Sequence, residues 1–298
     1  MKVAIIGSTG QLGSDISNVF GKEALPLSHD EIEVKDINSC RKALKDADTV
    51  INCAAYVKVD DSEDHPDEAF MINAIGARNV AIVCNEEHLK NVYISTDFVF
   101  DGEKEEPYNE DDDPNPINTY GLSKYAGEIF TRNYCSRPYV IRSASLYGTK
   151  GARGKGGNFV EWMIKKANNN EIIKVVDDVV MSPTYTKDIA KMIKNIIEKE
   201  LPYGIYHVTN QGYCSWFDFA KKIFEFLDIK PLQGLRGRGA EPHNAKLFPI
   251  KPDELNRKAR RPKFSALEST KLKKYGLEMR SWEDALKDYL RERTGGVK

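Results

Sequence analysis

A glycine-rich turn between a short apolar strand and a helix constrains the fold of this chain more than any other feature. The apolar residues 3–6 lead directly into GSTGQLG, where Gly7, Gly10 and Gly13 form a G-x-x-G-x-x-G pattern. Glycines permit a tight turn and the close approach of backbone to a pyrophosphate, and the helix that follows supplies N–H groups and a positive dipole end. The context predicts a dinucleotide-binding turn; the alternative is a plain glycine-rich β–α turn.

The segments after this turn alternate between strand and helix patterns as far as residue 148. Their order, β-α-β-α-β-α-β-α-β, predicts an α/β fold with a Rossmann-type doubly wound parallel sheet and a ligand crevice beyond the strand ends. The later elements predict a smaller C-terminal substrate-binding domain, while 59–65 and 228–263 have irregular patterns. We expect a dinucleotide-binding domain of 1–148 plus about 182–209, and a substrate-binding domain of about 149–181 and 210–298.

A Tyr-x-x-x-Lys pair, Tyr120 and Lys124, stands where a helix is expected to begin. Residues four apart project from one face of a helix, so the phenol and the ammonium should be neighbours. A neighbouring cation should lower the pKa of the phenol from its ordinary value near ~10, so that Tyr120 can exchange protons at neutral pH. Thr96, at the end of the strand 91–100, would bring a second hydroxyl to the same oxygen. This spacing is common on ordinary helices, so its meaning depends on the rest of the chain.

Two other strand ends carry residues suited to a cofactor. Ala54 and Ala55 end the strand 48–56, where backbone could lie against a flat ring, although a plain buried strand end is an equal alternative. A dinucleotide fold usually has an acid near the end of its second strand to bind the ribose, and this region offers Ser28, His29 and Asp30, then Asp36. The window 26–34 has no Lys or Arg for a 2′-phosphate. The choice between NAD and NADP is left open.

Composition excludes several classes of function. The formal net charge of the 298 residues is −1, which argues against a nucleic-acid partner. No apolar run approaches the ~18 residues of a membrane-spanning helix, and the N-terminal apolar run is too short for a signal peptide. The five scattered cysteines have no metal-ligand spacing. We therefore expect a cytoplasmic protein with reduced thiols and without a metal, a membrane partner or a nucleic-acid partner.

Three features have two interpretations each. Asn73 lies in the middle of an expected helix, where it either bonds backbone near the site or is solvated. The glycine-rich segment 149–157, with Arg153 and Lys155, is either a mobile lid that meets phosphate or a flexible loop. The basic segment 228–263, with Arg236, Arg238 and further arginines, could bind a diphosphate if one or two of its arginines are fixed in the crevice, and its part 233–247 is longer than is usual in related sequences.

Three stretches, GSTGQLG, STDFVFDG and YGLSKYAGE, resemble the extended short-chain dehydrogenase/reductases. The stretches INCAAYVKVDDSE, VVDDVVMSPTYTKDIA and ARRPKFSAL extend the resemblance nearly end to end and narrow it to the dTDP-4-dehydrorhamnose reductase family. The resemblance implies reduction of the C4 ketone of a nucleotide-linked 6-deoxy sugar, such as dTDP-4-dehydro-L-rhamnose, with NADPH or NADH. A nucleotide-sugar substrate and a possible homodimer are the expected partners.

The resemblance also implies roles for individual residues. Tyr120 would protonate the C4 oxygen as the cofactor delivers hydride, Thr96 would polarise the carbonyl, and Lys124 would hold the nicotinamide ribose. The implied cofactor contacts are Lys124, Gly7, Gly10, Gln11, Leu12, Gly13, Asp36, Ile37, Ala54, Ala55 and Tyr56. The implied substrate contacts are Thr96, Asp97, Tyr120, Ser145, Asn158 and Arg261.

One departure from the family pattern concerns the sugar. The family usually has a tryptophan that contacts the sugar where this chain has Ser145, so a related 4-keto-6-deoxy sugar nucleotide is an alternative substrate. Two rival functions share the scaffold. An epimerase or dehydratase of nucleotide sugars would retain NAD tightly, and a non-catalytic NAD(P)-binding regulatory subunit would bind the cofactor without turnover.

Overall fold

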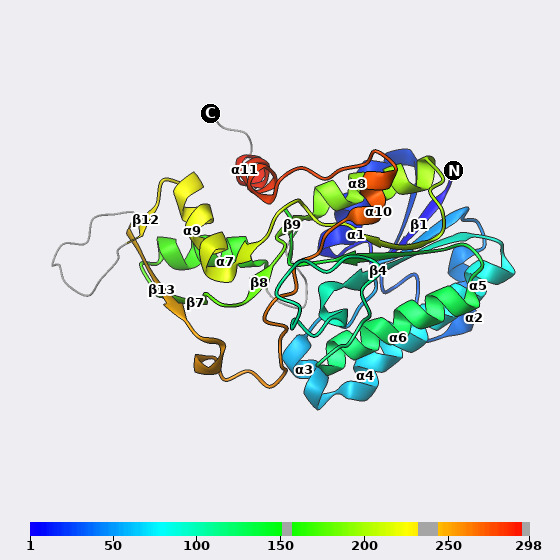
Figure 1. Cartoon of the computed structure of the whole chain (residues 1–298). Helices are drawn as coiled ribbons and strands as arrows, with labels where there is room; N and C mark the ends of the chain where they lie inside the picture. The colour runs from blue at the N-terminus through cyan, green and yellow to red at the C-terminus, as the bar shows by residue number, and fades with distance from the viewer. Residues whose placement is uncertain (151–156, 232–243, 294–298) are drawn as a thin grey trace.

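A six-stranded parallel sheet forms the larger part of the protein (Figure 1). The computed structural model describes residues 1–150, 157–231 and 244–293. The strand order is β10-β5-β4-β3-β1-β2, which reverses between β1 and β3 and confirms the predicted doubly wound sheet. The strands are β1 (Val3–Ile6), β2 (Ala24–Leu27), β3 (Thr49–Asn52), β4 (Lys90–Thr96), β5 (Pro138–Ser143) and β10 (Gly204–His207).

Helices cover both faces of this sheet (Figure 1). Successive side chains of a strand point to opposite faces, so Val3 and Ile5 pack in one apolar cluster while Ala4 and Ile6 pack in another. The first cluster lies under α1 (Gln11–Phe20), α8 (Thr186–Glu198) and α10 (Thr270–Lys274). The opposite face carries α2 (Ile37–Leu44), α5 (Ala77–Glu86) and α6 (Thr119–Tyr134).

A separate apolar cluster lies to one side of the sheet, at the left in Figure 1. Its helices are α7 (Phe159–Asn168), α9 (Trp216–Phe226) and α11 (Trp282–Arg293). A small parallel sheet borders it, formed by β12 (Lys230–Pro231), β13 (Asn244–Ile250) and β7 (Ile172–Val176). The expectation that 228–263 is irregular is therefore wrong for β12 and β13. Because β13 pairs with β7, some seventy residues earlier, its local pattern does not reveal the partner.

Two short strand pairs join this side of the molecule to the large sheet. They are β6 (Leu146–Tyr147) with β9 (Thr184–Tyr185), and β8 (Val180–Met181) with β11 (Cys214–Ser215). Single-turn helices occur at η1 (Gly21–Glu23), η3 (Asp97–Val99) and η4 (Pro252–Glu254). β6 follows β5 directly in the chain and leads it out of the large sheet toward α7, and β9 leads it back to α8.

The segment before α5 differs from expectation in two ways. The acidic stretch expected to be irregular forms the helix α3 (Val59–Asp64). Asp60 and Asp61 lie in its first turn, where their negative charges interact favourably with the positive end of the helix dipole. The helix expected from Pro66 is interrupted: α4 (Pro66–Phe70) continues into the π-helical turn η2 (Met71–Gly76) before α5 begins. Such wide turns occur often at functional sites.

Candidate active site

One cavity of about 780 Å³ opens beyond the carboxyl ends of β1, β3 and β4. This is the point at which the strand order reverses, where open parallel sheets bind their ligands. The cavity brings together three sets of residues predicted from the sequence: the glycine turn, the alanines after β3, and Thr96, Tyr120 and Lys124.

The glycine turn is closely packed against itself and against the chain after β3. Gly7 has a φ of +76°, a conformation that favours glycine, and a Cβ at Gly13 would collide with the carbonyl oxygen of Gly7. Among the described residues, no side chain caps the N-terminus of α1 at Gly10, and the buried Oε1 atom of Gln11 has no hydrogen-bond partner. A turn with glycine at its closest-packed positions, below a helix whose N-cap residue has no capping side chain, fits a diphosphate.

The cavity wall after β2 includes Ser28 and His29 of the residues that the sequence offered there, but not Asp30 or Asp36. Residues 28–29 and 32–35 line it, whereas Asp36 caps α2 by accepting a hydrogen bond of 2.9 Å from the backbone N–H of Asn38. Ile37 is the first residue of that helix. The wall includes Lys35, which lies one residue beyond the window searched for a cation and forms an ion pair with Glu33.

The wall after β3 is formed by Ala54 and Ala55, as predicted, while the chain at Tyr56 is held from behind. Asn73 accepts a hydrogen bond of 2.8 Å from the backbone N–H of Tyr56 and donates one of 3.1 Å to its carbonyl oxygen. The phenol of Tyr56 is directed to Asp61. The interpretation in which Asn73 bonds backbone near the site is therefore confirmed.

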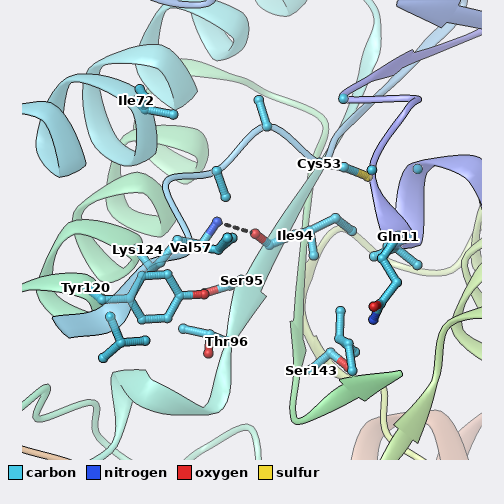
Figure 2. Close-up of a pocket in the computed structure, with 18 of the residues that line it drawn as sticks. Gln11, Cys53, Val57, Ile72, Ile94, Ser95, Thr96, Tyr120, Lys124 and Ser143 are labelled. Atoms are coloured by element: carbon cyan, nitrogen blue, oxygen red, sulfur yellow. Dashed lines mark hydrogen bonds between the residues drawn. The ribbon is translucent and has the colours of Figure 1, made fainter. Parts of the chain in front are cut away.

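The start of α6 is pressed against the end of β4, which explains how Tyr120 reaches Thr96. Asn118 caps α6 by accepting a hydrogen bond of 2.7 Å from the backbone N–H of Gly121. A Cβ at Gly121 would collide with the carbonyl oxygen of Phe98, so only glycine permits this approach. Figure 2 shows Tyr120 and Lys124 side by side and directed toward the strand that carries Thr96.

Burial controls the ionisation of both α6 groups. It raises the pKa of Tyr120 to about 12; a contact with the Thr96 side chain works against this rise, and the charge of Asp97 adds to it. Burial also lowers the pKa of Lys124 to about 7. The expectation that Lys124 lowers the pKa of Tyr120 is wrong here, since desolvation dominates and the amine is bound to the carbonyl oxygen of Ile94 at 2.6 Å. Tyr120 is thus a protonated phenol at neutral pH, which is the form that can donate a proton.

Asp97 links the end of β4 to the C-terminal part of the chain. Its carboxylate accepts hydrogen bonds from Thr96 at 3.0 Å and from Ser265 at 2.6 Å. Asp97 lines the cavity and is only 3% exposed. Residues more than 160 positions apart therefore meet beside the hydroxyl of Thr96.

The residues predicted for the sugar side lie in different places. Ser145 lines the cavity in a left-handed conformation, with a φ of +46°. Asn158 also lines it, but its side chain caps α7 and donates a hydrogen bond of 2.8 Å to the carbonyl oxygen of Gly148. Arg261 stands outside the wall and forms a two-point ion pair with Asp60 of α3, at 2.7 and 2.8 Å.

An aromatic wall was missed by the sequence reasoning. It consists of Phe159 and Trp162 from α7 and Trp216 and Phe219 from α9. The Phe159 and Trp216 rings are 4.7 Å apart, and Trp162 is 56% exposed. Phe219 also packs in the core cluster around α7, α9 and α11. The signal available in the sequence was Trp162, a large aromatic residue that falls outside the apolar stripe of its helix.

Some expectations fall on residues that are not described. Arg153, Lys155, Arg236 and Arg238 lie outside the ranges 1–150, 157–231 and 244–293. Within those ranges, no group of three or more His, Cys, Asp or Glu side chains could hold a metal ion. None of the helices described is long and apolar enough to cross a membrane.

Comparisons with known proteins identify relatives along nearly the whole chain. A family model described as the RmlD substrate binding domain matches residues 1–294. The chain is 35% identical to the spore coat polysaccharide biosynthesis protein SpsK of Bacillus subtilis, covering 98% of each sequence. It is 35% identical to the dTDP-4-dehydrorhamnose reductase of Mycolicibacterium smegmatis, covering 96% of this chain and 84% of the relative. The crystal structure of dTDP-4-dehydrorhamnose reductase from Bacillus anthracis in complex with NADP superposes with a TM-score of 0.88, at 39% identity, covering 98% of this chain and 100% of the other.

Proposed function

The chain belongs to the RmlD substrate-binding-domain family, and from this premise we propose that it reduces the C4 ketone of a nucleotide-linked 6-deoxy sugar. The substrate is dTDP-4-dehydro-L-rhamnose, the product is dTDP-L-rhamnose, and the reductant is NADPH or NADH. The observation that carries the proposal is the single cavity that joins the glycine turn to Thr96, Tyr120 and Lys124. Relatives named dTDP-4-dehydrorhamnose reductase support the reaction.

The proposed chemistry follows from the state of each group. The bound dinucleotide supplies the hydride. Tyr120, kept protonated by burial, donates its phenolic proton to the C4 oxygen as charge develops there. Thr96 stands beside this hydroxyl and now donates its single O–H to Asp97, so it is proposed to turn from Asp97 to donate to the same oxygen when the substrate is bound. Lys124 faces the cavity from one turn further along α6 and is proposed to bind the ribose next to the nicotinamide.

Both cofactors fit the proposed site, and the wall after β2 gives a reason to rank them. The chain contributes Lys35 there, and a cation at this position can meet the 2′-phosphate of NADPH. Glu33 beside it is the acid that could instead accept from the ribose of NADH. The related Bacillus anthracis structure contains NADP, which supports NADPH as the first cofactor to test.

The aromatic wall is proposed to receive the nucleotide part of the substrate. The side chain of Trp162 is largely exposed, with the Lys166 amine 5.2 Å from the ring centroid, and stacking on an aromatic ring is tolerant of the base that is bound. Ser145 leaves the sugar side without the bulky ring that the family resemblance implies. Arg261, engaged with Asp60, is a candidate for diphosphate binding only if that ion pair opens.

The test is oxidation of NADPH and of NADH with enzymatically generated dTDP-4-dehydro-L-rhamnose, followed by loss of the reduced-nicotinamide absorbance. Rapid loss establishes the reductase and ranks the cofactors. No loss, with cofactor binding measured separately, would favour another 4-keto sugar first and the regulatory-subunit function second. NAD retained through purification would favour the epimerase or dehydratase.

Three further expectations remain predictions. A homodimer is tested by light scattering during size-exclusion chromatography, and a cytoplasmic location by cell fractionation. The two-domain division is supported by the separate cluster around α7, α9 and α11. We adjust its boundary, because Leu272, Leu277 and Met279 pack in the core of the large sheet rather than with that cluster.

A further inference from the structure

A buried ion pair lies one helical turn beyond Lys124. Glu128 on α6 is fully buried and Arg142 on β5 is 1% exposed. The guanidinium grips the carboxylate at two points, Nε to Oε1 at 3.0 Å and Nη2 to Oε2 at 2.8 Å. Replacing such a pair by apolar residues is often neutral for stability, so stability alone does not explain a buried ion pair at this place.

The same carboxylate is tied to the strand that carries Thr96. Ser95 donates a hydrogen bond to Glu128, and Lys124 donates one of 2.6 Å to the carbonyl oxygen of Ile94. Two adjacent residues of β4 are therefore bound by two residues one turn apart on α6. The next residue of the strand is Thr96, so these bonds fix its position relative to Tyr120.

Glu128 acts on Lys124 through its charge, from one helical turn away on α6. Desolvation lowers the pKa of Lys124; the charge of Glu128 opposes this shift most strongly, and that of Cys53 after β3 opposes it less. From β4 the amine faces the Tyr93 ring, 4.2 Å from its centroid. On β5 the charged group is Arg142, which is turned to Glu128, and η2 contributes the neutral Asn73 behind Tyr93. Among these neighbours, Glu128 alone carries a negative charge at neutral pH.

We propose that Glu128, fixed by Arg142, is a positioning residue that keeps Lys124 cationic and holds Ser95 so that Thr96 faces Tyr120. This role rests on the proposed function, in which Lys124 binds the cofactor ribose. In this arrangement Arg142 orients Glu128, and Glu128 supports both Lys124 and β4. Lys124 and the end of β4 in turn face the ligand.

The test is a double-mutant cycle on NADPH affinity, measured by fluorescence titration at about pH 6 and about pH 8. Lys124 is half deprotonated near pH 7, so removal of the anion should matter most above that pH. We expect Glu128→Gln to weaken NADPH binding by about tenfold at pH 8 and by about twofold at pH 6. In a Lys124→Met background, the same substitution should change affinity less than about twofold at either pH, since the two residues act together.

A purely structural role gives a different pattern: equal loss at both pH values, and the same loss in the Lys124→Met background. Either result would overturn the proposal. Asp188→Asn, which breaks the ion pair between Asp188 on α8 and the half-buried Arg280 before α11, is the control and should leave the pH dependence of NADPH affinity unchanged.

Two provisions keep the test decisive. Where Glu128→Gln alone fails to fold because Arg142 is left unpaired, the variant Glu128→Gln/Arg142→Met removes both charges and is used in its place. Because the readout requires no sugar, a failed turnover assay with wild-type protein would count against the proposed substrate and not against Glu128.

Discussion

The amine of Lys124 donates a hydrogen bond of 2.6 Å to the carbonyl oxygen of Ile94, two residues before Thr96. One residue of the Tyr-x-x-x-Lys pair therefore fastens α6 to β4, while the other faces the cavity with its phenol (Figure 2). Lys124 is thus engaged in holding the two elements together, and Tyr120 is the group proposed to act on a ligand.

Tyr120→Phe should abolish turnover and leave NADPH affinity nearly unchanged. The phenylalanine fills the same space but cannot donate a proton, and loss of a general acid typically costs about 10²–10⁴-fold in rate. The measurement is kcat beside a fluorescence titration of NADPH. Tyr125→Phe, on the same helix, is the control and should keep full activity. Undiminished turnover by Tyr120→Phe would remove this residue from the mechanism.

Trp162→Ala should raise the KM for the nucleotide sugar by about tenfold, since base–aromatic stacking contributes ~1–3 kcal/mol. NADPH affinity and kcat should change little, because the ring lies on α7 and away from the glycine turn. Steady-state kinetics with varied sugar nucleotide measures the effect. Trp162→Phe should recover most of the loss; a KM that stays at the wild-type value in Trp162→Ala would show that the ring does not contact the substrate.

Lys35→Ala should weaken NADPH binding by about tenfold and leave NADH binding unchanged, because only NADPH carries the 2′-phosphate that a cation attracts. Titration of both cofactors gives the ratio directly. Lys42→Ala, on the outer side of α2, removes the same charge away from the cavity and should change neither affinity. An equal loss for NADPH and NADH in Lys35→Ala would mean that the residue supports the wall without reading the phosphate.

His207 should make the fold sensitive to acid. Burial lowers its pKa from 6.5 to about 3, and its ring is bonded to the carbonyl oxygens of Tyr108 and Glu268. Between those pH values the unfolded chain binds more protons, so the free energy of unfolding falls as pH decreases from about 6.5 toward 3.

The measurement is urea unfolding of wild type and His207→Gln at about pH 7 and pH 5. Each pH unit inside the window is worth up to ~1.4 kcal/mol, so the wild type should lose about 2 kcal/mol more than the variant. Parallel losses in the two proteins would show that His207 does not titrate in this range.

The sequence predicted the features that depend on local pattern. The glycine turn after Ile6 and the alternation of strands and helices follow from short-range spacing, and the structure has both. Asn73 was a local anomaly, a polar residue in an expected helix, and it bonds the chain behind Ala55. Local exceptions of this kind are visible before any coordinates are known.

What the sequence could not predict depends on contacts between distant segments. The rise in the pKa of Tyr120 comes from burial, which cannot be counted from neighbours in the chain. The aromatic wall needs α7 and α9 to meet at the cavity, and β13 needs its partner β7. Arg261 was assigned to the substrate by resemblance, but its position beside Asp60 depends on how the C-terminal segment crosses α3.

The bond between Ser265 and Asp97 has a consequence for biosynthesis. Thr96 and Tyr120 are made in the first half of the chain, but the carboxylate beside them gains this partner only after residue 265 has been added. The neighbouring bridge between Tyr108 and Leu267 is completed at the same late stage. A nascent chain can fold its glycine turn and central strands early. It should become a finished enzyme only after residue 267 has been added, so a chain terminated before that residue should bind cofactor without being able to consume it.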